Sequence, residues 1–188
     1  MKILFNILII IFLSTTTLFS QDGVKLSTKS KKAIRYYEAA TKFYDNYNNL
    51  SCIEEAKKAI AEDPQFIEAY FLIASTFSDM KESEDAIDYY QKAIAIDEDY
   101  YPGAYYLLAG LQLSVGKYAE AGDNFRKFLQ FKGESPLKRK GAEKGLEVVN
   151  FALYQIEHPV PFDMKNMGEN INSANDEYLP AITADEQT

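Results

Sequence analysis

Three short phrases of the sequence repeat at a nearly constant interval. Cys52, Ala86 and Ala121 hold the same place in "SCIEEAKKAIAEDP", "EDAIDYYQKAIAIDED" and "AEAGDNFRKFLQF", 34 and then 35 residues apart. A period near 34 residues, built from two short amphipathic helices, is typical of a helical-hairpin solenoid. Because one hairpin cannot bury its apolar face alone, the hairpins must stack into a curved surface. The repeat therefore predicts a binding scaffold rather than a catalyst.

The first twenty residues have the three-part layout of a secretory signal peptide. Lys2 precedes an apolar run over 3–13, and a short polar stretch over 14–17 leads to Ser20. The apolar run is shorter than the roughly 20 residues that span a bilayer. We predict a signal peptide over 1–20 and an exported chain, with an uncleaved membrane anchor as the alternative. A polar leader over 21–32 follows, with little to bury.

Charge and cysteine content limit the partners and the chemistry. The net charge is −8, and removal of Lys2 with the signal peptide would make it −9. An acidic surface repels phosphate backbones, so we expect no nucleic-acid partner. Cys52 is the single cysteine, which excludes a disulfide within the chain. Its place in the repeat predicts a small buried side chain at a helix crossing rather than a reactive thiol.

Each repeat carries a similar series of aromatic and small residues. The residues expected to pack the repeats are Tyr36, Ala40, Phe43, Cys52, Ala59, Tyr70, Ala74, Phe77, Ala86, Tyr90, Ala93, Tyr105, Ala109, Ala121 and Phe125. With Pro64 closing the first unit, the series resembles the tetratricopeptide repeat family position by position. It departs from that family at Glu98, where proline is usual, at Gln112, where an aromatic residue is usual, and at Phe128, where a small residue is usual.

The resemblance implies an all-α, right-handed solenoid of three helical hairpins over 33–66, 67–101 and 102–134. A C-terminal capping helix is predicted over 135–158, because Ser135-Pro136 is a helix start signal. A terminal repeat also needs a capping element whose outer face is polar and exposed to solvent. Its apolar side is expected to carry Leu146, Val149, Leu153 and Ile156. The basic residues over 138–144 are interpreted as a solvated face, with a contact to anionic lipid or polymer as the alternative.

In the tetratricopeptide repeat family the first helix of each hairpin lines the concave face. The resemblance therefore implies a partner-binding surface, expected to hold an extended peptide or a partner helix, made of Tyr37, Thr41, Tyr44, Phe71, Ser75, Ser78, Tyr106 and Leu113. The alternative is that some of these rings pack between repeats or under the capping helix. Family members that clamp a C-terminal carboxylate use Lys and Asn at the positions of Tyr37, Thr41 and Ser75. We therefore expect no carboxylate clamp.

The segment 159–188 begins with the linker "PVPF" and continues as "NMGENINSANDEYLPAITADEQT". This segment resembles the opening of a WD-like β-propeller in exported envelope proteins of Gram-negative bacteria. The matching residues are Gly168, residues 170–173, residues 176–178, Pro180 and residues 183–185. Those proteins end in an OmpA-like peptidoglycan-binding domain, and some act in type IX secretion and gliding. The resemblance implies a fragment of a longer periplasmic protein, associated with the outer membrane and bound to peptidoglycan only through a missing domain. A natural tail is the alternative.

The sequence offers little for catalysis. His158 is the single histidine and lies at a predicted helix end, where a bond to exposed carbonyls explains it. The paired acidic residues fall at expected helix starts or turns. We therefore predict a non-enzymatic protein-binding scaffold with no cofactor, metal or small-molecule substrate. The alternatives are a free-standing periplasmic adaptor and an accessory module of an enzyme whose catalytic domain is missing.

Overall fold

The computed structural model describes residues 25–160, and within them it contains seven α-helices and no strand. The helices are α1 (Lys31–Asp45), α2 (Asn49–Glu62), α3 (Ile67–Asp79), α4 (Ser83–Ile96), α5 (Gly103–Ser114), α6 (Tyr118–Gln130) and α7 (Pro136–Glu157). The predicted all-α class is confirmed. The expectations for the signal peptide, the first part of the leader and the segment after Val160 lie outside the described residues.

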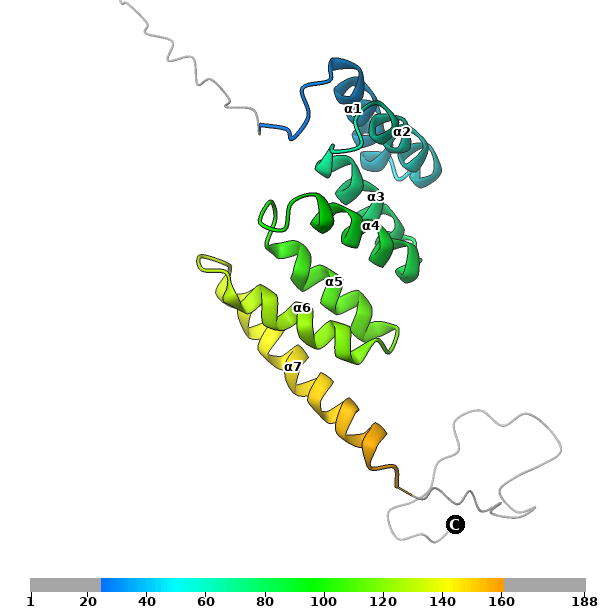
Figure 1. Cartoon of the computed structure of the whole chain (residues 1–188). Helices are drawn as coiled ribbons and strands as arrows, with labels where there is room; N and C mark the ends of the chain where they lie inside the picture. The colour runs from blue at the N-terminus through cyan, green and yellow to red at the C-terminus, as the bar shows by residue number, and fades with distance from the viewer. Residues whose placement is uncertain (1–24, 161–188) are drawn as a thin grey trace, which may run out of the picture.

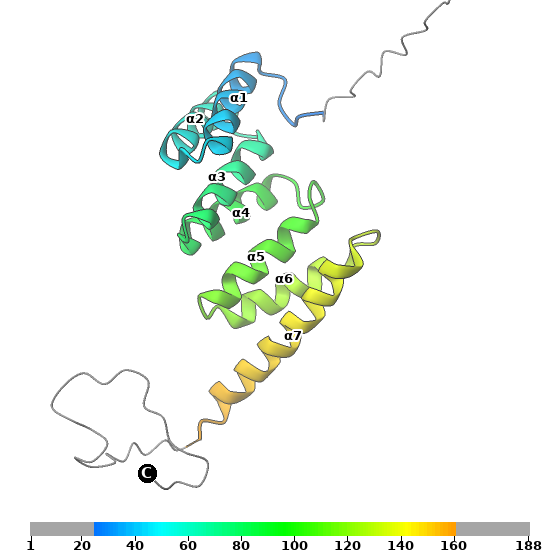
Figure 2. The ribbon, with the colours of Figure 1, turned by 180° about the vertical axis from the view of Figure 1, so that it is seen from behind.

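Consecutive helices pair into three hairpins that stack in chain order (Figure 1). The hairpins are α1–α2, α3–α4 and α5–α6, and each contacts the next through its second helix. The last helix, α7, packs against α6 and α5 at the end of the stack, as a capping helix should (Figure 2). The architecture is therefore the predicted solenoid of three hairpins and a cap.

The turn within each hairpin has the same backbone conformation. A residue with positive φ occupies the same repeat position three times, at Tyr47 (57°), Lys81 (65°) and Gly116 (79°). The N–H of the next residue then donates to a carbonyl oxygen of the first helix: Asn48 to Phe43 (2.9 Å), Glu82 to Phe77 (2.9 Å) and Lys117 to Gln112 (2.8 Å). These bonds satisfy carbonyls that a helix end would leave without partners. The third hairpin thus keeps the turn despite its unusual side chains.

Small side chains lie where neighbouring helices cross. The buried members of the predicted packing set are Ala40, Cys52, Ala59, Ala74, Ala86, Tyr90, Ala93, Tyr105, Ala109, Ala121 and Phe125. The other four, Tyr36, Phe43, Tyr70 and Phe77, are half-buried. Alanine at a crossing brings two backbones close and lets the larger rings fill the space beside it. The periodic residues therefore build four apolar clusters along the stack rather than one central core.

The third hairpin replaces an aromatic pair with an amide pair. Gln112 is buried, and its Oε1 accepts a hydrogen bond of 2.7 Å from Nδ2 of Asn124 on α6. In the second hairpin the same two positions hold the rings of Phe77 and Tyr89, with centroids 5.7 Å apart. Because the buried Gln112 amide has a partner, the substitution is tolerated. Phe128, which stands where a small residue is usual, is fully buried in the cluster beneath α7.

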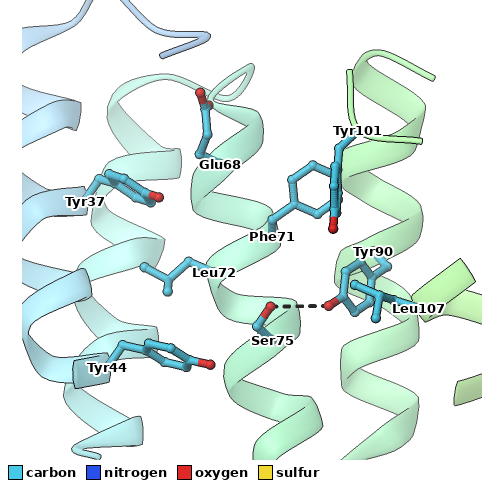
Figure 3. Close-up of a pocket in the computed structure, with 9 residues that line it drawn as sticks. All are labelled: Tyr37, Tyr44, Glu68, Phe71, Leu72, Ser75, Tyr90, Tyr101 and Leu107. Carbon is cyan, nitrogen blue, oxygen red and sulfur yellow. Dashed lines mark hydrogen bonds between the residues drawn. The ribbon is translucent and has the colours of Figure 1, made fainter. Parts of the chain in front are cut away.

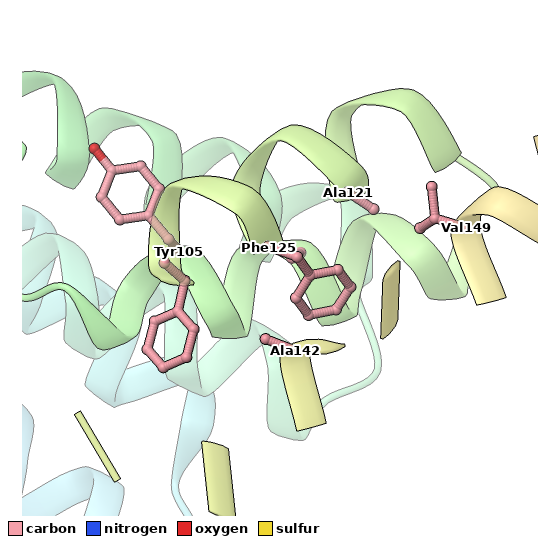
Figure 4. Packing of buried hydrophobic residues seen from close by; sticks show 7 residues of the cluster. Tyr105, Ala121, Phe125, Ala142 and Val149 are labelled. Atoms are coloured by element: carbon pink, nitrogen blue, oxygen red, sulfur yellow. The ribbon is translucent and has the colours of Figure 1, made fainter. Parts of the chain in front are cut away.

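The capping helix fits its neighbours through two glycines. An added Cβ at Gly141 would lie 2.5 Å from the Tyr106 hydroxyl, and one at Gly145 would lie 2.4 Å from the Phe125 ring. Ala142 and Val149 are buried beside them (Figure 4). Glycine here permits the close approach of α7 to the rings of α5 and α6.

The predicted apolar side of the cap needs one correction. Leu146 and Leu153 pack against the cluster, but Ile156 is 63% exposed. The helix of 22 residues is longer than the neighbouring α6 of 13 residues, so its last turns extend past the surface that would cover them. Ser135 precedes Pro136 as expected, although the Ser135 side chain makes no capping hydrogen bond.

The end of the leader is more closely packed than the sequence indicated. Thr28 is buried and its hydroxyl donates to Oδ2 of Asp63, while Leu26 packs against a cluster that includes Phe66. The N–H of Ile67 donates to Ser27 Oγ at 2.9 Å, at a helix start where Phe66 offers no side-chain cap. The leader therefore supplies the missing cap of α3, and the expectation that it has little to bury is wrong for these residues.

Two glycine substitutions should shift stability in opposite directions. Gly145→Ala drives Cβ into the buried Phe125 ring, so we expect a loss of about 1–3 kcal/mol in the free energy of unfolding. Gly110→Ala meets no atom within 4 Å and removes a flexible residue from α5, so we expect a gain of about 1 kcal/mol. Urea denaturation monitored by circular dichroism measures both, and equal effects of the two substitutions would contradict the packing described.

Cys52 should be unreactive in the folded protein. Its Sγ lies 3.3 Å from Oγ1 of Thr76, and burial raises the pKa of the Cys52 thiol. A raised pKa leaves less thiolate at pH 8 than an exposed cysteine has, and burial also blocks access. We expect an aromatic disulfide reagent at pH 8 to label the protein only when urea unfolds it. Labelling in native buffer at the rate of free cysteine would refute this.

Candidate functional site

The first helices of the hairpins share one side of the solenoid, and two adjacent hollows lie on that side. The first hollow, of about 370 Å³, is lined by Tyr37, Tyr44, Glu68, Phe71, Leu72, Ser75, Tyr90, Tyr101 and Leu107. The second hollow, of about 470 Å³, is lined by Ser78, Tyr106, Leu107, Gly110, Leu111, Leu113, Phe125, Gly141, Lys144, Gly145 and Val148. Leu107 is 37% exposed and lines both hollows. The two hollows therefore form one surface, which we call the groove.

The groove follows from the repeat itself. Tyr37, Phe71 and Tyr106 occupy one repeat position, and Thr41, Ser75 and Gly110 occupy the position four residues later. Residues four apart lie on the same face of a helix, so each first helix presents a ring followed by a small residue. The small residue leaves room beside the ring. This pairing creates space along the groove without breaking the helices.

Most of the predicted partner-binding residues do line the groove. Tyr37, Tyr44, Phe71 and Ser75 line the first hollow, and Ser78, Tyr106 and Leu113 line the second. Thr41 lines neither, and its hydroxyl donates to the carbonyl of Tyr37 in the same helix at 2.8 Å. The structure thus brings the predicted residues into two groups rather than one continuous row.

Two predicted binding rings also have packing roles. The Tyr106 ring lies 5.4 Å from the Phe128 ring and 6.0 Å from the Phe125 ring, beneath α7. The Tyr37 ring lies 5.0 Å from the buried Phe66 ring. Both contacts agree with the alternative that some of these rings pack between repeats or under the capping helix. Phe71 packs as well, with its ring 6.0 Å from the ring of the buried Tyr90, whereas Tyr101 is 40% exposed and is the ring of the first hollow most open to a partner.

The first hollow has a wall that the repeat pattern did not indicate. Tyr101, in the loop between α4 and α5, is 40% exposed and meets the Phe71 ring edge to face at 5.6 Å (Figure 3). The Lys138 ammonium group of α7 lies 5.6 Å from the Tyr101 ring centroid. An added Cβ at Gly103 would lie 2.7 Å from the same ring. The phrase "YYPG" at 100–103 was the available signal, since aromatic residues in a loop are often functional.

Glu68 links three parts of the chain at the edge of the first hollow. Its carboxylate accepts hydrogen bonds from the backbone N–H of Ser27 at 2.9 Å, from the Ser27 hydroxyl and from the Tyr100 hydroxyl. Burial and the bond to Glu68 raise the pKa of Tyr100. The leader, α3 and the loop that carries Tyr101 are therefore held together by one side chain.

The polar groups of the groove are mostly hydroxyls. Ser75 Oγ lies 3.3 Å from the Tyr90 hydroxyl (Figure 3). The Tyr44 hydroxyl donates to Asp79 at 2.8 Å, which raises the pKa of Tyr44 to about 12. Glu68 is the single acidic residue of the first hollow, whose lining holds no Lys or Arg. Lys144 is the charged residue of the second hollow. Such a surface can accept apolar side chains and hydrogen-bond to a peptide backbone.

Within residues 25–160, no group of His, Cys, Asp and Glu could hold a metal ion. None of the helices in that range is both long and apolar enough to span a bilayer. His158 stacks on Tyr154, with ring centroids 4.3 Å apart, and its Nδ1 lies 3.0 Å from the Tyr154 carbonyl oxygen. The histidine therefore lies at the helix end and outside the groove.

Comparison with known proteins agrees with this geometry. Residues 67–100, which hold α3 and α4, match the tetratricopeptide repeat family. A search of the curated proteins finds no match.

Three solved structures share the fold. The first TPR of Spaghetti (RPAP3), bound to the HSP90 peptide SRMEEVD, is 20% identical with a TM-score of 0.58, covering 68% of this chain and 97% of that one. The Yersinia enterocolitica type III secretion chaperone SycD, in complex with a peptide of the translocator YopD, is 16% identical with a TM-score of 0.57, covering 65% and 95%. The Sgt2 TPR domain from Aspergillus fumigatus is 15% identical with a TM-score of 0.56, covering 77% and 93%.

The second hairpin thus matches the tetratricopeptide repeat family by sequence, and the described residues together have the fold of tetratricopeptide repeat domains. The resemblance inferred from the repeated series is confirmed to that extent. The likeness of the segment after Val160 to a propeller, and the envelope context that it implies, stay predictions.

The link between Glu68 and Tyr100 should appear as a coupling energy. Glu68→Ala and Tyr100→Phe each remove the charge-assisted hydrogen bond between them, so the double variant should lose about 1 kcal/mol less stability than the sum of the single variants. Urea denaturation of the four proteins measures this. Glu54→Ala on α2, combined with Tyr100→Phe, is the matched control and should be additive. Additivity in both cycles would remove Glu68 as a link.

Proposed function

We propose that the chain is a non-catalytic scaffold that binds an extended segment of a partner protein in the first hollow. The observation that carries the proposal is the convergence of five rings, those of Tyr37, Tyr44, Phe71, Tyr90 and Tyr101, from three helices and a loop. Rings of this kind are rigid, bury a large apolar area and offer hydroxyls to a peptide backbone. Tyr101 is the most exposed of these rings and meets the Phe71 ring directly, so we expect these two residues to be the anchors.

The charge of the first hollow favours a neutral or basic segment. Two proteins of the same fold carry peptides, the HSP90 peptide SRMEEVD in one and a peptide of the translocator YopD in the other. The HSP90 peptide is acidic, whereas the lining of the first hollow includes the Glu68 carboxylate and no Lys or Arg; Lys138 contacts the Tyr101 ring but is not part of that lining. The carboxylates of an acidic peptide and of Glu68 would repel each other in a site partly shielded from solvent. This chain should therefore select against acidic C-terminal peptides.

The place of action that we propose rests on the sequence. The apolar run over 3–13 supports export to the periplasm, and the propeller-like segment supports the N-terminal module of an OmpA-like envelope protein, associated with the outer membrane and with type IX secretion. In that setting peptidoglycan would be bound by a domain outside this chain. A free-standing adaptor, or an accessory module of an enzyme, would use the same groove.

A displayed random peptide library tests the groove directly. Selection on the chain should enrich peptides that carry aromatic or aliphatic residues with Lys or Arg and that lack an acidic C-terminus. Phe71→Ala combined with Tyr101→Ala removes both anchors, so the affinity for an enriched peptide should fall at least about tenfold, as for interface anchors generally. Isothermal titration calorimetry measures the change.

Two controls make the result specific. Tyr47→Ala changes a ring that is 90% exposed in a hairpin turn, and it should leave the affinity unchanged. The peptide SRMEEVD should give no measurable heat of binding. Equal binding of an enriched peptide to the double variant, with helicity intact, would exclude the first hollow. Tight binding of SRMEEVD would overturn the charge argument.

A further inference from the structure

A large hollow lies beside the end of the leader. Its volume is about 760 Å³, and residues 25–29 line it together with Ile34, Gln65, Ile67, Ile96, Asp97 and Tyr100. The leader thus borders an open space where it crosses the start of α3, instead of packing along its whole length. A segment with few buried apolar contacts depends on its hydrogen bonds for its position.

Ser27 bonds to two groups at the start of α3. Its backbone N–H and its hydroxyl both donate to the Glu68 carboxylate, and its Oγ accepts the N–H of Ile67 at 2.9 Å. Ser27 is nevertheless absent from the lining of the first hollow, whereas Glu68 belongs to it. Ser27 can therefore affect that hollow only through the groups that it holds.

From Glu68 the contacts lead to the Tyr101 ring. Glu68 also accepts a hydrogen bond from the Tyr100 hydroxyl, and Tyr101 is the next residue of the same α4–α5 loop. Two further ties of this loop run to the C-terminal end of the stack. Glu98 pairs with Lys127 of α6 at 3.0 Å, and Lys138 of α7 contacts the Tyr101 ring. The loop is therefore held from two sides, and the Tyr100–Glu68 bond ties it to α3.

We propose that Ser27 is a positioning residue of the first hollow. By holding Glu68 it holds Tyr100, and so it keeps the Tyr101 ring against Phe71, where the partner binds. The inference rests on the proposed function, since it takes Tyr101 as an anchor for the partner. The coupling is reciprocal, because a ligand that favours one position of the loop also favours the docked leader. The affinity for the partner is thereby set in part by a segment that does not line the hollow.

Hydrogen–deuterium exchange of the chain without a peptide tests the first step. Ser27→Ala removes the hydroxyl from Glu68 and from the Ile67 N–H, so the amides of residues 99–105 should exchange at least about fivefold faster, as in a loop that loses a tie. Ser27→Thr keeps the hydroxyl and should restore the native exchange. Unchanged exchange in Ser27→Ala would overturn the proposal without any knowledge of a partner.

The affinity for a peptide enriched from the displayed library, measured by calorimetry, tests the second step. Ser27→Ala should lower it at least about fivefold, the lower end of the usual range for coupled sites. In a Glu68→Ala chain the same substitution should lower it by less than about twofold, because Ser27 acts through Glu68.

Ser30→Ala is the matched control. Ser30 Oγ accepts the N–H of Ala33 at 3.2 Å, so its hydroxyl caps α1 rather than bonding to Glu68. Both alanine variants therefore cost a helix start one side-chain acceptor, but Ser30→Ala should leave the peptide affinity and the exchange over 99–105 unchanged. Equal losses of affinity in the two variants would overturn the inference, since a general loss of stability would then explain both.

The inference and the proposed function fail in different ways. A library that enriches no peptide on the native chain would contradict the proposed function, and the exchange measurement would still decide whether Ser27 holds the loop. Faster exchange in Ser27→Ala with unchanged peptide affinity would overturn the inference and leave the proposed function standing.

Discussion

The fold depends on close helix crossings that only small side chains permit. Ala40 and Cys52 in the first hairpin, and Ala109 and Ala121 in the third, are fully buried. At such a crossing a larger side chain would push the helices apart, and the rings beside it would lose their contacts. Each hairpin then buries its remaining apolar face only against the next, so stability is distributed along the stack. The capping helix ends that stack by the same means, with glycine in place of alanine.

The groove also depends on small side chains placed beside large ones. A ring and a small residue follow each other on the exposed side of the first helices, and the small residues of the second and third hairpins, Ser75 and Gly110, line the two hollows. Repetition alone, however, would give a row of equivalent spaces. The two hollows differ because α7 covers the Tyr106 ring at one end, while Tyr101 adds a ring to the other. The chemistry of the surface is therefore set by residues outside the repeat.

Glu68 shows how the leader and a loop between hairpins stabilise the helices. It joins the leader to the α4–α5 loop, and Ser27 serves both as its donor and as the acceptor for the first N–H of α3. A helix start without its own cap is thus stabilised by a residue forty positions earlier in the chain. The loop that positions Tyr101 is anchored by the same carboxylate, so the shape of the first hollow depends on the leader.

The sequence by itself determined the helical hairpins, their order and the small residues at their crossings, because a 34-residue period and an amphipathic stripe are local properties of the chain. It also located most residues of the groove, since side-chain direction follows helical spacing. Only the tertiary structure decided that Thr41 bonds to its own helix, that Tyr106 lies beneath α7 and that Ile156 is exposed. It likewise placed Ser27 at the start of α3 and Tyr101 against Phe71. These contacts join residues from different helices or loops, and helical spacing carries no information about how far a neighbouring helix extends or where a loop folds back.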